Sequence, residues 1–268
     1  MIEGLLDFAA SSDIGTERPG NEDACGILRV GEDCGVVVVA DGVSLANAGE
    51  VASALAVEVV LRAFQEEPAE IGAGARLYRA VQQANIEIYD KQIAVPELRG
   101  MSTTLTAVVV DRGELTAVHV GDSRLYLLRE GSITQLTKDH TVAAEKVRLK
   151  VMSKEKARVS ADRSVLTRSM GRELIVARDR LSQRLRQCDA LLLCSDGLHG
   201  VLPDEALARL VGEAPAAEAC RALLEAANSM GTPDNLTAAV LRVVGPLPDG
   251  GPAAPGLGQR RKRLFGSV

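Results

Sequence analysis

Two apolar runs in the sequence each end on an Asp-Gly pair. Residues 36–42 read Val-Val-Val-Val-Ala-Asp-Gly and residues 190–197 read Ala-Leu-Leu-Leu-Cys-Ser-Asp-Gly, so the two carboxylates are Asp41 and Asp196. Apolar runs of this length, especially with β-branched residues, are typical of buried strands. A carboxylate at the end of a buried strand is unfavourable unless something pairs with it, although Asp-Gly is also a common turn signal. On this pattern alone, a turn and a functional site both remain open.

Apolar residues recur at helical spacing in two long segments, residues 46–66 and 74–93. This spacing predicts two helices that each bury one stripe. The expected stripes are Val51, Leu55, Val59 and Ala63 in the first helix, and Leu77, Val81, Ala84 and Ile88 in the second.

Short strand-like segments dominate the middle of the chain. Turn signals separate four of them and predict an antiparallel meander through residues 102–110, 114–120, 124–129 and 132–136. A polar loop is expected at 11–23, further strands at 24–30, after 165 and at 236–244, and helices at 204–210 and 216–230. Helix pairs between blocks of antiparallel strands favour an α+β fold with helices outside and sheets inside.

A charged segment and the C-terminal composition define the domain organisation. Residues 141–156 have a helical pattern but are rich in Lys, Glu and Arg, and Ser153 interrupts them, so a surface excursion is expected. No linker-like composition occurs before residue 245, so residues 1–245 are predicted to form a single domain. Residues 246–268 turn to Pro and Gly and then to four consecutive cations, which predicts a disordered basic tail.

Composition narrows the class of protein. With 268 residues, 46% hydrophobic residues and a formal charge of -5, the chain is typical of soluble globular proteins and not of nucleic-acid binders. Aromatic residues make up only 2%, which argues against recognition of sugars or bases by stacking. Five cysteines without a C-x-x-C pair indicate reduced thiols. We expect a cytoplasmic monomer without a signal peptide or membrane span.

Six acidic residues stand at predicted strand ends or in loops bounded by glycine. They are Glu22, Asp23, Asp41, Asp122, Asp196 and Asp234. If they converge, their mutual repulsion raises their pKa values, and a bound cation is the usual way to keep several of them ionised. Oxygen ligands without His or Cys favour Mg²⁺ or Mn²⁺ over Zn²⁺. The sequence thus predicts a hard-metal site.

Eight short motifs occur in an order and spacing that resemble the type 2C metal-dependent serine/threonine protein phosphatases (PPM) of the bacterial type. They extend over nearly the whole expected domain, from about residue 11 to residue 244. The motifs are Arg18-x-x-Asn21-Glu22-Asp23, Val39-Ala40-Asp41-Gly42, Gly49-Glu50-x-Ala52-Ser53, Ser102-Thr103-Thr104, Val120-Gly121-Asp122-Ser123-Arg124, Leu136-Thr137-Lys138-Asp139-His140, Leu193-Cys194-Ser195-Asp196-Gly197 and Asp234-Asn235-Leu236-Thr237.

This resemblance implies a four-layer α-β-β-α sandwich, in which two central antiparallel sheets are flanked by helix pairs. It also implies two Mn²⁺ or Mg²⁺ ions in a cleft at one end of the sandwich. Asp41, Asp196 and Asp234 would hold one of these ions. Asp122 together with Asp196 would form a third, weaker metal position.

The resemblance also assigns the second ion and the phosphate group. Asp23, alone or together with Glu22, would hold the second ion with Asp41 and the carbonyl of Gly42. Arg18 would anchor the phosphate, a task that suits a permanently charged, planar guanidinium that grips two oxygens at once.

The implied reaction is hydrolysis of phosphoserine or phosphothreonine on proteins by a metal-activated water, which reverses the action of a Ser/Thr kinase. The implied partners are phosphoprotein substrates and a cognate kinase. His140 and His199 are candidates for the general acid only by elimination, and a structural role fits each better. The excursion at 141–161 corresponds to the flap beside the cleft in bacterial members.

The chain departs from the family pattern directly after Asp41-Gly42. It reads Val43-Ser44-Leu45 where the family has a further pair of glycines, and bulkier residues are strained wherever the loop needs positive φ. This departure leaves open a catalytically weak or silent phosphatase-like module that binds phosphoproteins.

A serine esterase is the third hypothesis. Gly121-Asp122-Ser123 followed by Asp196-x-x-His199 fits the Gly-Asp-Ser and Asp-x-x-His pattern, in which Ser123 would be a nucleophile activated by His199. That pattern normally follows the first strand, and it leaves Arg18, Asp41 and Asp234 unexplained. The metal-dependent phosphatase is therefore the preferred hypothesis.

Overall fold

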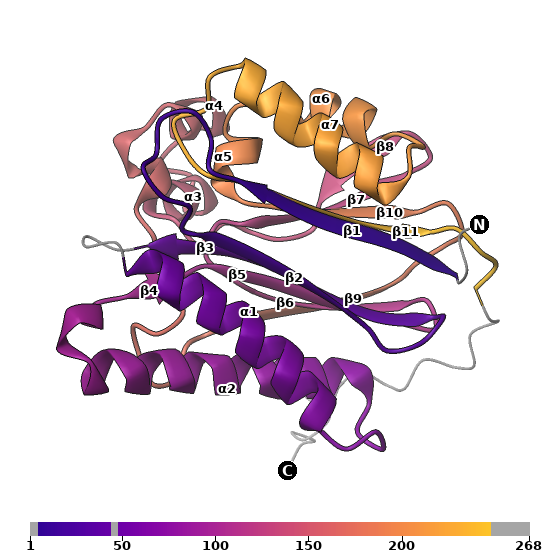
Figure 1. Ribbon diagram of the computed structural model, residues 1–268. Coiled ribbons are helices and arrows are strands. Elements are labelled where there is room, and N and C mark those ends of the chain that lie inside the picture. Colours follow the sequence, from indigo (N-terminus) through magenta and orange to yellow (C-terminus); the bar gives the residue numbers. More distant parts are fainter. Residues whose placement is uncertain (1–4, 44–47, 248–268) are drawn as a thin grey trace, which may run out of the picture.

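Two antiparallel sheets lie face to face, with helices on both outer sides (Figure 1). The computed structural model describes residues 5–43 and 48–247. The first sheet has the order β1 (Leu6–Asp13), β11 (Leu236–Val243), β10 (Ala190–Cys194), β7 (Arg124–Arg129) and β8 (Ser132–Gln135). The second has the order β2 (Asp23–Arg29), β3 (Cys34–Val43), β5 (Leu105–Asp111), β6 (Glu114–Val120) and β9 (Asp179–Arg184), with β4 (Ser102–Thr103) paired to β3.

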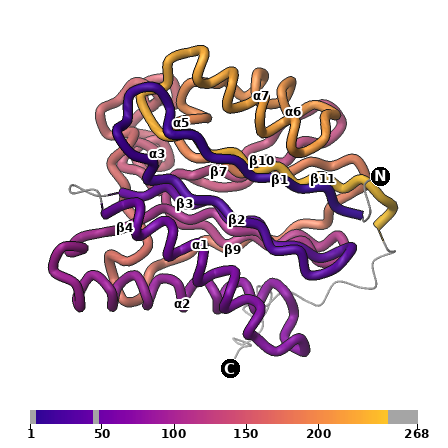
Figure 2. Tube along the Cα trace, in the orientation of Figure 1, coloured from indigo at the N-terminus to yellow at the C-terminus, as the bar shows by residue number. Residues whose placement is uncertain are grey.

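Each sheet is covered by its own pair of helices. Helices α1 (Gly49–Glu66) and α2 (Ala73–Ala94) pack on the second sheet, and α6 (Asp204–Val211) and α7 (Ala216–Ser229) pack on the first (Figures 1 and 2). The expected four-layer α-β-β-α sandwich is therefore confirmed. None of the described helices is long and apolar enough to cross a membrane.

The remaining helical segments are short. A 3-10 turn, η1 (Pro96–Leu98), follows α2. Between β8 and β9 the chain forms α3 (Val142–Arg148), α4 (Lys154–Arg158) and η2 (Ala161–Ser164), and α5 (Asp196–His199) follows β10 directly. The expected charged excursion is thus present as α3, α4 and η2.

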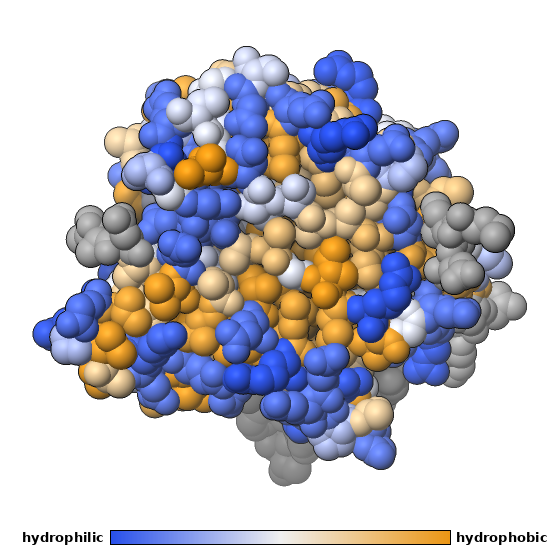
Figure 3. Space-filling view, in the orientation of Figure 1, coloured by the Kyte–Doolittle hydropathy of each residue, from blue (hydrophilic) through white to orange (hydrophobic). Residues whose placement is uncertain are grey.

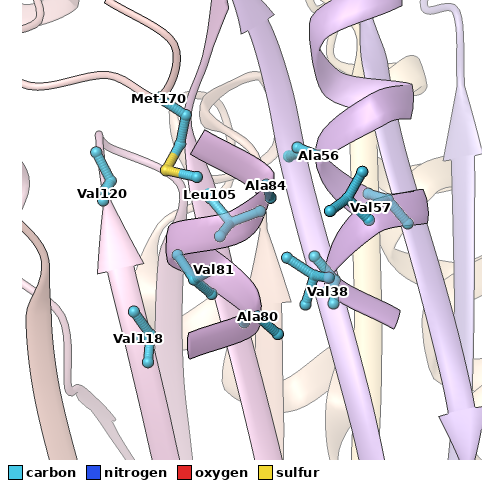
Figure 4. Close-up of a cluster of buried hydrophobic side chains, with 14 of the residues drawn as sticks. Val38, Ala56, Val57, Ala80, Val81, Ala84, Leu105, Val118, Val120 and Met170 are labelled. Carbon is cyan, nitrogen blue, oxygen red and sulfur yellow. The ribbon is translucent and has the colours of Figure 1, made fainter. Parts of the chain in front are cut away.

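The apolar core forms three clusters, one between the sheets and one beneath each helix pair. Figure 4 shows the cluster beneath α1 and α2, where Val38 of β3 faces Val57 of α1, and Val81 of α2 lies near Leu105 and Val118. Small aliphatic residues allow this close layering in a chain with few aromatics. In Figure 3, apolar residues gather over the edge strands β1 and β2, framed by hydrophilic residues on the helical layers.

The expected stripe of α1 is confirmed at Val59 and Ala63, which are buried, and is displaced by about one residue in the first half of the helix. Ala52, Ala56 and Val60 are fully buried, whereas Val51 and Leu55 are only half-buried. The stripe predicted for α2 is confirmed, since all four of its members are buried. Small side chains let the helix approach the sheet closely, so Ala52 and Ala56 face the sheet where Val51 and Leu55 were expected to do so.

The predicted four-stranded meander is wrong. Strands β5 and β6 pair with each other, but β7 and β8 belong to the other sheet, where β7 pairs with β10. The Gly-Asp turn signal predicts a hairpin, yet the chain crosses there from one sheet to the other. Gly121 has φ of 105° and lies so close to Thr104 that an added Cβ would stand 2.6 Å from that side chain. Only glycine fits this crossing.

Strand β1 was not predicted from the sequence. It pairs with β11 along all eight of its residues and forms one edge of the first sheet. Its polar second half, Ser11 to Asp13, lacks the apolar alternation of a strand, because an edge strand is only half-buried. The expected polar loop is therefore shorter and begins after Asp13.

Candidate metal centre

Asp23 and Asp41 lie directly opposite each other on neighbouring antiparallel strands. Asp23 begins β2, Asp41 lies near the end of β3, and the two are register partners. Directly opposed like charges destabilise a sheet unless they are neutralised. The valine run of β3 is completely buried and fixes this register, so the position of Asp41 follows from the core that precedes it.

The backbone of Asp41 is held by a cluster of buried hydroxyl groups. Its N–H donates to Thr104 Oγ1 over 3.0 Å, and its carbonyl accepts from Thr104 N–H over 2.8 Å and from the Thr103 hydroxyl over 2.9 Å. The Thr104 hydroxyl in turn contacts the Ser123 hydroxyl. These bonds fix the backbone of Asp41, and its carboxyl group is left facing the neighbouring carboxylates.

Asp196 stands where β10 passes into the short helix α5. The following Gly197 lies so close to the neighbouring chain that a Cβ there would be 2.1 Å from the carbonyl oxygen of Asn235. This contact requires glycine and brings Asp196 beside Asp234, which precedes β11. The carboxyl groups of Asp41 and Asp196 lie within hydrogen-bonding reach of each other when one of them is protonated. The two Asp-Gly motifs of the sequence therefore meet.

Burial and mutual repulsion raise the pKa values of these carboxyl groups. Burial is the main cause for each of them, and neighbouring carboxylates add to it. The pKa of Asp41 is raised well above its usual value, that of Asp23 to about 7 despite a hydrogen bond from Ser195, and that of Asp196 to about 6. In Asp196, the hydrogen bond to Asp41 and the charges of Arg163 and Arg18 partly offset the increase. Such a cluster favours a compensating cation.

Asp122 approaches the cluster from the crossing between β6 and β7. It is 7% exposed, and its pKa is raised well above its usual value, first by burial and then by the nearby charges of Asp196 and Asp139. The backbone of Asp122 is held by His199, whose Nε2 lies 3.0 Å from the Asp122 carbonyl oxygen. Burial lowers the pKa of His199 to about 4, so the ring is neutral and donates this hydrogen bond.

Arg18 lies at the mouth of the cluster. Its Nη2 donates to Asp234 Oδ2 over 2.8 Å, and its Nε donates to the Pro233 carbonyl over 3.2 Å. The Arg18 side chain is 44% exposed, and that of Asp234 is 34% exposed. The guanidinium is therefore positioned at the acidic site and remains accessible from solvent.

Glu22 and Gly42 meet next to the start of α1. Gly42 N–H donates to the Glu22 carbonyl over 3.0 Å, and the Ser53 hydroxyl donates to the same carbonyl over 2.5 Å. A Cβ on Gly42 would lie 2.3 Å from the Gly49 carbonyl oxygen, and a Cβ on Gly49 would lie 2.6 Å from Glu22 Oε1. Two glycines are therefore needed for Glu22 to pack against the start of α1.

Ser44 and Leu45, the departures from the family pattern, lie outside the described residues.

The donor set fits a hard divalent cation. All of the candidate side chains are carboxylates, and the backbone carbonyl of Gly42 adds another oxygen, as Mg²⁺ and Mn²⁺ prefer. Within the described ranges, no three His, Cys, Asp or Glu side chains are arranged so that they could hold one metal ion together. Two of the carboxylates are engaged elsewhere, because Asp234 pairs with Arg18 and Asp23 accepts from Ser195.

The structure does not assemble the serine-esterase site. The buried Ser123 hydroxyl contacts Thr104, and His199 Nε2 is bonded to the carbonyl oxygen of Asp122 instead of the Ser123 hydroxyl. A nucleophilic serine needs a hydrogen bond to its general base. Ser123 and His199 therefore serve as supports for Asp41 and Asp122.

His140 also has a structural environment. Its Nδ1 accepts from the N–H of Gly121 over 3.1 Å, and its Nε2 lies 3.1 Å from Arg168 Nη1 and 3.3 Å from Asp179. Burial and Arg168 lower its pKa. The third histidine, His119, stacks against His140 at 4.8 Å between ring centroids, and burial lowers its pKa to about 4. Among the described residues, neither ring has a hydrogen bond to a carboxylate of the cluster.

Sequence reasoning assigned no role to two residues that hold the site together. The Ser195 hydroxyl donates to Asp23 Oδ2 over 2.6 Å and accepts from Thr237 N–H over 3.0 Å, which joins the two sheets. Asn235 fixes the loop before β2, since it accepts from Glu22 N–H over 2.9 Å and donates to the carbonyls of Ile14 and Gly20. Each of the two residues stands directly beside a predicted ligand in the sequence. This position is the signal by which the sequence could have identified them.

Comparison with known proteins gives the same result as the geometry. The family model described as "Protein phosphatase 2C" matches residues 15–241. Serine/threonine phosphatase stp of Listeria monocytogenes is 34% identical over 230 residues, which cover 84% of this chain and 91% of the relative. Serine/threonine protein phosphatase PstP of Mycobacterium tuberculosis is 37% identical over 241 residues, 90% of this chain. The chain spans 45% of the length of PstP.

Solved structures resemble the whole fold. The crystal structure of PstP/Ppp from Mycobacterium tuberculosis has a TM-score of 0.81 at 36% identity, covering 90% of this chain and 99% of the other. The catalytic domain of PstP in complex with two manganese ions has a TM-score of 0.79 at 36% identity, covering 90% and 99%.

Together, the four-layer fold and the carboxylate cluster assign this chain to the class of proteins with the fold of metal-dependent phosphatases. Within that class, the chain belongs to the protein phosphatase 2C family.

Proposed function

We propose that this chain is a metal-dependent protein phosphatase that hydrolyses phosphoserine and phosphothreonine on proteins. The observation that carries this proposal is the convergence of buried Asp122 with half-buried Asp41 and Asp196, all with raised pKa values, beside an accessible arginine. Burial of several like charges is unfavourable without a compensating cation. The relatives named as serine/threonine phosphatases, and the manganese-bound PstP domain, support the assignment.

The assignment of ligands follows the resemblance residue by residue. Asp41, Asp196 and Asp234 would hold one Mn²⁺ or Mg²⁺ ion, and Asp23 or Glu22 with Asp41 and the Gly42 carbonyl would hold a second. Asp122 with Asp196 would provide a weaker third position. Bound divalent cations in such a site make water nucleophilic near neutral pH and neutralise charge on phosphoryl oxygens.

The protein's own groups then have separate tasks. Arg18 would bind the phosphate oxygens, because its guanidinium is exposed at the mouth and permanently charged. Thr104 and Ser123 would keep Asp41 in place, and His199 would keep the Asp122 backbone in place. No described serine, threonine or histidine is both at the cluster and free to act as a covalent nucleophile, which favours direct attack by water.

The decisive experiment follows phosphate release from a phosphothreonine peptide. Turnover should disappear in EDTA and return with Mn²⁺ or Mg²⁺, and it should be lost in Asp41→Asn and Asp196→Asn variants. Wild-type turnover no higher than in these two variants would support the silent phosphopeptide-binding module instead. Turnover that survives EDTA and is abolished by a serine-directed phosphonate would support the esterase.

The biological setting is part of the same proposal. We infer a monomeric, cytoplasmic enzyme in which residues 1–245 form a single domain, with substrates phosphorylated by a cognate Ser/Thr kinase. Size-exclusion chromatography with light scattering tests the monomer, and recovery of phosphoproteins that accumulate on an Asp41→Asn protein tests the partners.

A further inference from the structure

A large cleft extends from the carboxylate cluster to the charged excursion between β8 and β9. Its volume is about 950 Å³. Asp122 and Asp196 lie at one wall, and residues of α3, α4 and η2 form the opposite wall. Figure 1 shows α3 and α4 beside α5, at the end of the sandwich where Asp196 begins that helix. A peptide whose phosphate reached the cluster would thus have its flanking residues beside α3 and α4.

The excursion carries a charge opposite to that of the rest of the chain. Residues 141–164, which contain α3, α4 and η2, have seven Lys and Arg residues and three Asp and Glu residues, whereas the whole chain has 31 and 36. Two of the three acids are already paired within the excursion, Glu145 with Arg148 and Asp162 with Lys146. A concentrated positive field therefore faces one side of the cleft.

Two cations on this wall have no ion-pair partner among the described residues. Lys154 and Arg158 begin and end α4, line the cleft and are exposed. Of the other cleft cations, Arg124, Arg148 and Arg168 are each paired with a carboxylate, and Lys138 lies outside the excursion, next to Asp139. Arg163 also lines the cleft, but it acts on the pKa of Asp196, so its replacement would disturb the cluster itself.

Acidic groups of the cleft do not neutralise this pair. Asp139, Asp179 and Glu145 are held by their own arginines. Asp204, at the start of α6, is the remaining cleft carboxylate outside the carboxylate cluster in the described part of the chain.

Glu155 lies between the two cations on α4, and its pKa is lowered first by backbone and Ser153 hydrogen bonds and then by the charges of Arg158 and Lys154. It is exposed and forms no ion pair with either cation in the described part of the chain, so both remain available to an external anion.

The base of the excursion is fixed to the site. Thr141 and Leu166 form a β-bridge, Val142 N–H donates to Val165 over 2.9 Å, and Thr167 N–H donates to the carbonyl of His140 over 2.8 Å. The His140 backbone is bonded in turn to Gly121, directly before Asp122. The α4 cations are consequently held on a frame that is continuous with the carboxylate cluster.

We propose that Lys154 and Arg158 select substrates in which acidic residues flank the phosphorylated serine or threonine. This inference rests on the proposed function and names its substrate class. The Asp or Glu side chains of the peptide would pair with the two cations while the phosphate lies at Arg18 and the carboxylate cluster. Continuity of the cleft with the cluster favours a peptide over an anionic membrane surface as the ligand of this wall.

The test compares three phosphothreonine peptides that differ only in flanking Glu, Ala or Lys residues. The wild-type kcat/KM should be about 3- to 20-fold higher for the Glu than for the Ala peptide, as expected for two exposed ion pairs. In Lys154→Glu/Arg158→Glu the preference should vanish or pass to the Lys peptide. The bond from Arg163 to the Arg158 backbone carbonyl does not depend on the replaced side chain.

A matched control is available on the same excursion. Lys150→Glu/Lys156→Glu makes the same change in net charge, but both residues are exposed and lie outside the residues that line the cleft. This control should keep the wild-type preference. Raising the salt concentration from about 20 to about 300 mM should weaken the preference of the wild type and the control alike.

The outcomes separate this inference from the proposed function. Equal wild-type kcat/KM for all three peptides, or the same loss of preference in both double variants, would overturn the role of Lys154 and Arg158. Sedimentation with phosphatidylserine vesicles that requires these two residues, without peptide discrimination, would overturn it in favour of a lipid surface. Failure of the proposed function itself would appear differently, as wild-type protein without metal-dependent turnover of any peptide or of p-nitrophenyl phosphate.

Discussion

Arg18 Nη2 and Asp234 Oδ2 are 2.8 Å apart, so the proposed phosphate anchor and a proposed metal ligand hold each other across the mouth of the site. A cation bound at Asp234 would neutralise the carboxylate that retains Arg18. The guanidinium would then be more available to phosphate. Binding of the metal and of the phosphate group is therefore expected to be coupled, with each favouring the other.

Replacement of Arg18 should impair substrate binding more than stability. Because both side chains of the ion pair are partly exposed, its loss in Arg18→Ala should change the free energy of unfolding by less than about 1 kcal/mol. Loss of a bidentate phosphate contact should lower kcat/KM by about 100-fold, mostly through KM. Arg18→Lys should recover only part of this, since an ammonium group is a point charge. Steady-state kinetics and thermal unfolding measure the two effects; an unchanged KM in Arg18→Ala would contradict the anchor role.

Neutralising Asp41 should stabilise the metal-free protein while it abolishes activity. In EDTA, Asp41→Asn removes a carboxyl group whose ionised form is disfavoured by burial and by Asp23, Asp196 and other carboxylates, so the melting temperature should rise. Turnover with Mn²⁺ should fall by at least about 1,000-fold, because electrostatic stabilisation of the reacting phosphoryl group is lost.

Asp139→Asn is the matched control for this stabilisation. Asp139 is also a partly buried carboxyl group, but bonds from Arg124 lower its pKa below the usual value despite the opposing effect of burial. Its neutralisation should therefore lower the melting temperature in EDTA. Equal changes of melting temperature in the two variants would show that Asp41 is not under repulsion from its neighbours.

The stabilisation that Mn²⁺ provides should increase with pH. In the metal-free protein, folding raises the pKa of Asp23 from 3.8 to about 7 and that of Asp196 from 3.8 to about 6. Between these limits the folded state binds more protons than the unfolded state, so the free energy of unfolding falls as pH rises from about 4 to 7. Bound metal keeps the carboxylates ionised and removes this loss.

The melting temperature with Mn²⁺ minus that in EDTA isolates the effect. Burial also lowers the pKa of His119 and His199 to about 4, which destabilises the fold as pH falls below 6.5. That contribution occurs with and without metal, so it cancels in the difference. We expect a larger difference at pH 8 than at pH 5.5. A difference that is constant over this range would show that these carboxylates do not take part in metal binding.

Ser123→Ala distinguishes a supporting hydroxyl from a nucleophile. The Ser123 hydroxyl contacts Thr104, which holds the N–H of Asp41, so its loss should lower the free energy of unfolding by about 1 kcal/mol. Metal-dependent turnover should stay within about tenfold of wild type, whereas removal of a catalytic serine costs about 10⁶-fold. Activity assays on the purified variant decide between the two, and a fall of several orders of magnitude in a folded protein would revive the esterase hypothesis.

The sequence was sufficient for the strands that carry Asp41 and Asp196, because uninterrupted apolar runs indicate burial directly. The sheet crossing at Gly121 was not predictable in the same way. A Gly-Asp turn signal describes local backbone geometry, whereas the contact of Gly121 with Thr104 depends on strands far apart in sequence. Strand β1 was missed for a related reason, since its pairing with β11 compensates for a polar second half.

The composition of the candidate site could be predicted, but its present arrangement could not. Carboxylates next to glycines at strand ends are visible in the sequence, and the resemblance gave their order. Partners such as Ser195 for Asp23 and Arg18 for Asp234 arise only when loops from both sheets meet. Their hydrogen bonds link residues that are 172 and 216 positions apart, a separation at which sequence patterns carry no pairing information.

A methyl group at position 42 tests the backbone ligand without changing any charge. The Cβ of Gly42→Ala would lie 2.3 Å from the Gly49 carbonyl oxygen and 2.7 Å from that of Glu22, and neither backbone atom can move without displacing the start of α1 or of β2. The Gly42 carbonyl should therefore shift, and the Mn²⁺ concentration for half-maximal activity should rise by at least about tenfold, the scale expected when a ligand is displaced. Gly20→Ala is the control, because a Cβ there would meet nothing within 4 Å. Manganese titrations of activity, together with calorimetric binding, should show the defect in Gly42→Ala alone, and wild-type affinity in a folded Gly42→Ala protein would exclude this carbonyl as a ligand.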